Sequence, residues 1–90
     1  MRARVVFLGS LRAATGRKEL NIELPKGARI SRLLDEISKT IPNLAQFIAM
    51  PPYGNLIIVN GVEIGNLKGI ETPIVEDSEV ILATVAHGGS

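Results

Sequence analysis

The feature that most constrains the fold is an apolar stripe in the middle of the chain, flanked on both sides by strand-like segments. Its residues lie at offsets of three, four, seven and eleven from the first: Ile30, Leu33, Leu34, Ile37 and Ile41. That spacing places them on one side of an α-helix. Ser31 is the expected N-cap, and Pro42 should end the helix because a residue before proline avoids the helical region.

Two strand-like segments precede this helix. Arg2 to Leu8 carries apolar residues on both of its faces, which is typical of a central strand, with Ala3, Val5 and Phe7 sharing one face. Residues 17–24 alternate between apolar and polar side chains, as a half-buried strand does. Residues 9–16 between them are expected to form a long turn, so the two strands make a hairpin.

The remaining strands follow the helix. The expected elements are, in order, a second short helix beginning near Asn43, a strand over 55–59, a short strand over 62–64, a mostly loop region over 65–77 and a last strand over 79–85. Asn60-Gly61 between two apolar runs predicts a tight hairpin, because both positions of such a turn need positive φ.

The order of these elements predicts the topology. A crossover between strands of one sheet is right-handed, which places the first and last strands side by side at the centre. We therefore expect an α+β fold of the β-grasp type, with a mixed sheet of four to five strands wrapped on one main helix. Residues 1–85 should form this domain, and residues 86–90 a flexible tail.

Composition narrows the range of functions. The chain has 90 residues, no cysteine and a single histidine, His87. These counts exclude a disulfide framework, a cysteine nucleophile and a multi-histidine metal site supplied by the chain. The net charge of +1 gives no reason to expect nucleic-acid binding, and no apolar run reaches membrane-spanning length. We expect a cytoplasmic monomer with no bound cofactor that is not an enzyme by itself.

Four segments in a fixed order carry a family resemblance. They are Phe7 to Gly16 with its Leu11-Arg12 pair, Val59-Asn60-Gly61, Thr72-Pro73 through Val80, and the diglycine Gly88-Gly89. Together they resemble the ubiquitin-like sulfur carriers, a family that includes the molybdopterin-synthase small subunit, the thiamine sulfur carrier and ubiquitin-related and small archaeal modifiers. The resemblance runs over essentially the whole chain and implies the same β-grasp fold.

The resemblance also implies a carrier that works through its tail. An E1-like adenylating partner would use ATP to convert the Gly89 carboxylate into an acyl-adenylate, and a sulfur donor would then give a thiocarboxylate. The sulfur would pass to molybdopterin biosynthesis or tRNA thiolation through a synthase or thiolase. Gly88 and Gly89 suit this role because no Cβ obstructs the adenylating site. An extended chain from Val85 to Gly89 reaches roughly 13 to 17 Å beyond the domain.

Two features of the tail depart from the sulfur carriers. The ending His87-Gly88-Gly89 is closer to the ubiquitin-related modifiers, and Ser90 follows the diglycine. Ser90 is either an addition to the natural chain or has to be removed before Gly89 can act. The ending favours an alternative function, a protein modifier joined through Gly89 to target lysines. A third possibility is an interaction module that binds through its sheet and makes no use of the tail.

A partner-binding surface is predicted beside the tail. Val80 and Leu82 should face the helix, which leaves Ile81 and Ala83 on the outer face of the sheet. Because the first and last strands are neighbours, these residues should adjoin other apolar side chains and form a docking patch. The predicted partner-binding residues are Val6, Leu8, Ile81, Ala83, Val85 and His87. Contact with acidic loops of a partner is one interpretation of Arg12, Arg17 and Lys68, but we expect these residues to be solvated charges.

Overall fold

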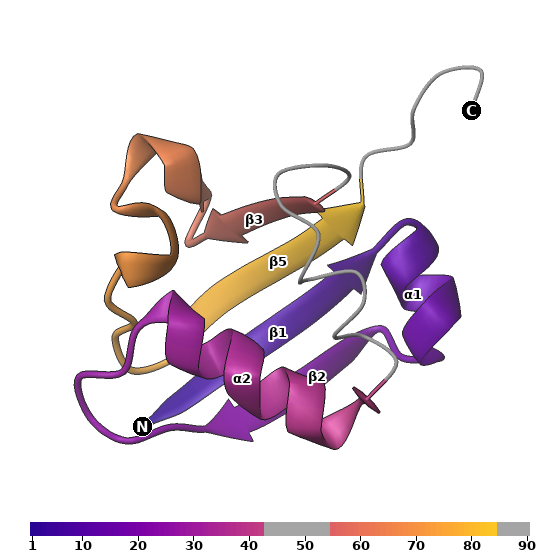
Figure 1. The fold of residues 1–90 in the computed structure, drawn as a ribbon, viewed down its shortest axis with the longest axis horizontal. Helices are drawn as coiled ribbons and strands as arrows, with labels where there is room; N and C mark the ends of the chain where they lie inside the picture. Colours follow the sequence, from indigo (N-terminus) through magenta and orange to yellow (C-terminus); the bar gives the residue numbers. More distant parts are fainter. Residues whose placement is uncertain (43–54, 85–90) are drawn as a thin grey trace.

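The computed structural model describes residues 1–42 and 55–84, and this part of the chain contains a single five-stranded sheet (Figure 1). Its strands are β1 (Arg2–Leu8), β2 (Glu19–Glu23), β3 (Asn55–Val59), β4 (Val62–Glu63) and β5 (Ser78–Thr84). They lie in the order β2-β1-β5-β3-β4, with β1 and β5 parallel and the other neighbours antiparallel. The predicted β-grasp layout, with the first and last strands adjacent, is confirmed.

The main helix, α2 (Ile30–Thr40), lies across one face of the sheet (Figure 1). Ile30, Leu33 and Ile37 are fully buried, and Leu34 and Ile41 are partly buried. The strands supply the facing core residues, namely Ala3, Val5, Phe7, Ile22, Val59, Val80 and Leu82. The predicted apolar stripe therefore packs on the inner face of the sheet, and the helix ends before Pro42 as expected.

The segment between β1 and β2 is not the long turn that the sequence suggested. It contains a short helix, α1 (Ser10–Thr15), which ends at Gly16 in the left-handed conformation with φ of 69°. The Gly16 N–H donates to the carbonyl oxygen of Arg12 at 3.0 Å, and this bond closes the last turn. Leu11 on this helix is buried in the core.

The expected N-cap of α2 is also wrong by two residues. The helix begins at Ile30, with Arg29 rather than Ser31 at the cap and no side-chain cap. The Ile30 N–H donates to the carbonyl oxygen of Thr72 at 3.0 Å, so a tertiary contact satisfies one of the free amides of the first turn. That long-range bond cannot be foreseen from the local sequence.

The second half of the chain follows the prediction with small shifts. Asn60 and Gly61 have φ of 48° and 87°, which confirms the tight turn. The short strand predicted over 62–64 ends at Glu63, because Ile64 already belongs to a 3₁₀ helix, η2 (Ile64–Asn66). The mostly loop region that follows holds a second one, η3 (Gly69–Glu71). The second short helix expected near Asn43 lies outside the described residues. Over 1–42 and 55–84, no helix is long and apolar enough to span a membrane.

Candidate functional site

The chain leaves the sheet at the end of β5. This strand is hydrogen-bonded on both sides, to β1 and to β3, and it ends at Thr84 (Figure 1). The tail therefore starts from a strand that is held in the interior of the sheet rather than from a free edge. The predicted tail residues Val85, His87, Gly88 and Gly89, together with Ser90, lie outside the described residues.

The predicted outer-face residues lie together, as expected from the sequence. Val6 pairs with Ile81 and Leu8 with Ala83 in the parallel register of β1 and β5. Leu8 is 42% exposed and the other three side chains are half-buried. Because β1 and β5 are parallel, their C-terminal ends lie at the same end of the sheet, and this apolar cluster lies toward that end, where the tail begins.

Strand β3 extends this cluster with two residues that the sequence analysis did not assign to it. Leu56 pairs with Ala83 and Ile58 with Ile81, so both side chains share the outer face, and both are half-buried. We call the six residues the outer apolar patch: Val6, Leu8, Leu56, Ile58, Ile81 and Ala83. The alternation of β3 could have identified these two residues, but only once β3 was known to neighbour β5.

The other half of the outer face is charged. Arg2 pairs with Glu23 at 3.4 Å, and Arg4 pairs with Glu19 at 3.4 Å and also with Glu79. These ion pairs lie toward the start of β1 and β5, away from the tail. The outer face is thus divided into a neutralised polar half and an apolar half next to the end of β5.

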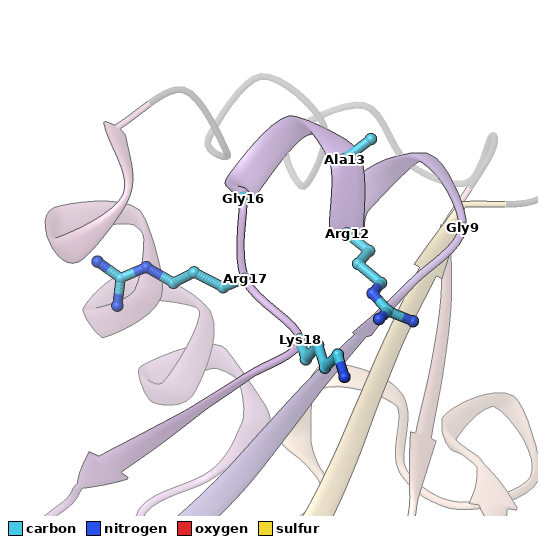
Figure 2. Close-up of a pocket in the computed structure, with 6 residues that line it drawn as sticks. All are labelled: Gly9, Arg12, Ala13, Gly16, Arg17 and Lys18. Carbon is cyan, nitrogen blue, oxygen red and sulfur yellow. The ribbon is translucent and has the colours of Figure 1, made fainter.

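A basic pocket lies at the same end of the sheet as the outer apolar patch. It has a volume of about 520 Å³ and is lined by Gly9, Arg12, Ala13, Gly16, Arg17 and Lys18, all of them exposed (Figure 2). In this view the Arg12 and Lys18 side chains extend to the same side, whereas Arg17 points away from them (Figure 2). Helix α1, which forms one wall, packs against both β1 and β5.

The charges of this pocket are not neutralised within the described part of the chain. Five other basic side chains are in ion pairs there: Arg2, Arg4, Arg29, Arg32 and Lys39. Arg12, Arg17 and Lys18 are in no ion pair with a described residue, and the segment 9–18 contains no acidic residue. The pocket therefore offers positive charge to an acidic surface.

The polar side chains of the described part of the chain form no metal site. Over 1–42 and 55–84, no group of three or more His, Asp or Glu side chains is placed to hold a metal ion. Every buried polar side-chain atom in this part of the chain has a hydrogen-bond partner. The candidate site is the surface formed by the outer apolar patch and the basic pocket around the start of the tail.

Comparison with known proteins establishes the fold. No family model matches the chain, and no curated protein matches its sequence. SAMP1, the small archaeal modifier protein 1 from Methanosarcina acetivorans, aligns with a TM-score of 0.81 at 22% identity, over 98% of this chain and 96% of that one. A putative molybdopterin converting factor, subunit 1, from Pyrococcus furiosus aligns with a TM-score of 0.73 at 23% identity, over 93% and 98%.

A third neighbour comes from a complex of two proteins. A chain of the Amycolatopsis orientalis BexX/CysO complex aligns with a TM-score of 0.76 at 18% identity, over 97% of this chain and 99% of that one. These neighbours are ubiquitin-like sulfur-carrier and modifier proteins, and at such identities the likeness establishes a common fold. The ubiquitin-like β-grasp fold expected from the sequence is confirmed.

Proposed function

We propose that this chain is a ubiquitin-like sulfur carrier that is activated at the carboxylate of Gly89. The observation that carries the proposal is the position of the diglycine relative to the fold. Strand β5 ends at Thr84 in the interior of the sheet, and Gly88-Gly89 follows after three further residues. Such a tail is long enough to enter the active site of a partner while the folded body remains outside it.

In this proposal the carrier supplies a substrate and a partner performs the chemistry. Removal of Ser90 by hydrolysis leaves the Gly89 carboxylate, which is a poor electrophile. An E1-like adenylating enzyme joins this carboxylate to the α-phosphate of ATP and releases pyrophosphate. A sulfide ion (HS⁻) supplied by a sulfur donor then attacks the acyl carbon, AMP leaves with the bonding electron pair, and Gly89 carries a thiocarboxylate. Every reacting group except the carboxylate belongs to the sulfur donor or to ATP, and the partner brings them together.

The surface around the end of β5 supports recognition by such a partner. The outer apolar patch can form the buried centre of an interface, and Arg12 and Lys18 of the basic pocket can form part of its charged rim. We expect the adenylating enzyme to present an apolar surface bordered by acidic side chains. Neither feature requires the carrier to change conformation on binding.

The thiocarboxylate would pass its sulfur to a synthase or thiolase. Molybdopterin biosynthesis is one candidate pathway, because a neighbour in fold is described as a molybdopterin converting factor subunit. Transfer RNA thiolation is the other. Either acceptor would have to admit the last residues of the tail to a narrow site, which glycine at positions 88 and 89 allows.

The direct test is ATP–pyrophosphate exchange with the adenylating enzyme of the same organism. The chain ending at Gly89 should support exchange, whereas the chain ending at Ser90 should not. With a sulfur donor added, the intact mass should increase by the replacement of one oxygen by sulfur. A folded chain ending at Gly89 that supports no exchange would overturn the proposal. If a chain without residues 86–90 retains full function in the cell, the protein is an interaction module.

A protein modifier is the second candidate function. The ending His87-Gly88-Gly89 favours it, and the fold is shared with a small archaeal modifier protein. In that case a lysine amine attacks the acyl-adenylate, AMP leaves, and an isopeptide bond forms. Peptide mapping of cellular proteins distinguishes the two candidates. Because Lys68 is the last basic residue of the chain before Gly89 other than His87, tryptic peptides that carry residues 69–89 on a target lysine appear only if the chain is conjugated.

A further inference from the structure

A groove at the far end of the sheet plays no part in the proposed tail chemistry. It has a volume of about 540 Å³ and is lined by Val59, Asn60, Val62, Leu67, Lys68, Thr72, Pro73 and Val75. The groove lies near the start of β5, since the Glu79 N–H donates to Oδ1 of its lining residue Asn60 at 2.9 Å. A strand of seven residues spans roughly 20 Å, so the groove and the end of β5 are far apart.

Exposed apolar side chains are concentrated around this groove. Three of the five large hydrophobic residues that the described part of the chain exposes line the groove. They are Val62 (40% exposed), Leu67 (43%) and Val75 (61%), and the other two are Leu8 and Ile70. Single exposed apolar residues are ordinary, but a contiguous group of them on a small domain is typical of an interaction surface.

The wall of the groove is held in place by hydrogen bonds. The Lys68 N–H donates to Oγ1 of Thr72 at 3.1 Å, and this hydroxyl donates to the carbonyl oxygen of Gly69 at 2.6 Å. The Val75 N–H donates to Oγ of Ser78 at 3.1 Å. The apolar side chains are therefore displayed from a fixed backbone, and binding of a ligand would require little loss of backbone entropy at this surface.

The polar groups of the groove indicate what it would bind. Asn60 and Thr72 already use their side chains in hydrogen bonds within the fold. Lys68 is in no ion pair with a described residue, and the nearby Glu71 is paired with Arg29 at 2.9 Å. An occupant therefore needs apolar side chains to cover the walls and one negative charge to complement Lys68.

We propose that this groove docks a short segment of a partner protein in which apolar side chains flank one carboxylate, with that carboxylate paired to Lys68. Because the groove is remote from the end of β5, this partner binds while the tail is engaged by another protein. The proposal does not depend on the tail chemistry, because it is tested by peptide binding to the groove rather than by activation of Gly89.

The test uses ¹⁵N-labelled full-length protein and two synthetic peptides. One has the sequence acetyl-Val-Ile-Asp-Leu-Val-amide, and the other carries Lys in place of Asp. Titration with the acidic peptide should shift the backbone amides of Val62, Leu67, Lys68 and Val75. The basic peptide keeps the apolar side chains but is repelled by Lys68, so it should shift them less at the same concentration. The affinity of the acidic peptide should fall about fivefold in Lys68→Glu, since one exposed ion pair is lost.

Matched controls separate the groove from general surface effects. Lys39→Glu makes the same charge change on α2 and should leave the affinity unchanged. Leu67→Ser should weaken binding, whereas Ile70→Ser, which changes another exposed apolar residue that does not line the groove, should not. Two-dimensional spectra of each free variant check that it remains folded.

Two outcomes would overturn the proposal. If the acidic peptide shifts none of the groove amides, or if both peptides shift them equally, the groove does not bind an acidic apolar ligand. Shifts of the same amides on simple concentration of the protein would identify a second copy of the chain as the occupant. ATP–pyrophosphate exchange supported by Leu67→Ser should equal that of the unmodified chain. A failure of the groove proposal is therefore distinguishable from a failure of the tail proposal, because the two are measured by peptide binding and by exchange respectively.

Discussion

Asn60 shows how a single residue joins two parts of the fold. Its φ of 48° lies in the left-handed region, which asparagine tolerates better than most residues. Its side chain accepts the Glu79 N–H at 2.9 Å and donates to Oγ of Ser78 at 3.4 Å. The residue therefore shapes the turn between β3 and β4 and also ties that turn to the start of β5.

Replacement of this side chain should be costly for an exposed position. Asn60→Ala should lower the free energy of unfolding by about 2 kcal/mol, from the lost hydrogen bonds and the strained φ together. Urea unfolding followed by circular dichroism measures the change. Asn60→Asp keeps the acceptor and the tolerance of positive φ, so it should lose less than half as much. Equal losses in the two variants would show that neither the acceptor for the Glu79 N–H nor the tolerance of positive φ contributes to stability.

At the scale of elements, α2 depends on its buried stripe more than on its caps. Ile37 is fully buried against the sheet, whereas Leu34, also on the stripe, is only partly buried. Ile37→Ala should lower the free energy of unfolding by about 2 to 5 kcal/mol, because it leaves a cavity in the core. Leu34→Ala should cost clearly less. Guanidinium unfolding of both variants checks this, and equal costs would mean that the helix does not pack as described.

The elements also show which parts of the fold the sequence could predict. The α2 stripe was identified because five apolar residues keep one helical period, and the β3–β4 turn because Asn-Gly permits positive φ at both positions. Helix α1 (Ser10–Thr15) is too short to display a helical period, so the sequence predicts a turn at these positions. The start of α2 is fixed by a bond to Thr72, which is far away in the sequence.

The candidate site was predictable to a similar extent. Alternation along β1 and β5 identified the outer-face residues, because strand periodicity assigns each side chain to a face. Leu56 and Ile58 were missed because alternation does not say which strands are neighbours. The basic pocket was missed because Arg12 and Lys18 come together only through the fold of α1 and the turn that follows it.

At the scale of the whole molecule, the two ends of the sheet should be functionally independent. Leu8→Glu places a charge in the outer apolar patch, so the KM of the carrier in ATP–pyrophosphate exchange should rise about tenfold or more. Val75→Glu makes the same kind of change at the far end and should leave KM unchanged. An equal effect of the two variants would show that the adenylating enzyme does not recognise the patch.

The basic pocket should act mainly on the rate of association. Arg12→Glu combined with Lys18→Glu should slow binding to the adenylating enzyme by about tenfold at low salt, and the difference should shrink as ionic strength rises. Stopped-flow measurements over a range of salt concentrations check this. Lys39→Glu with Arg32→Glu is the charge-matched control on α2. A salt-independent difference would indicate that the pocket does not steer association.

The pairing of the first strand with the last has a consequence for synthesis on the ribosome. Ala3 is aligned with Ser78 in the register of β1 and β5, and β3 reaches the rest of the sheet only through β5. A nascent chain that stops before residue 78 leaves β1 with one neighbour and the β3–β4 hairpin detached, so it cannot complete its core. The diglycine emerges after that strand. Under the proposed function, a chain that terminates before residue 78 therefore has neither a finished body nor a diglycine to be activated, and no proofreading step is needed to exclude it from activation.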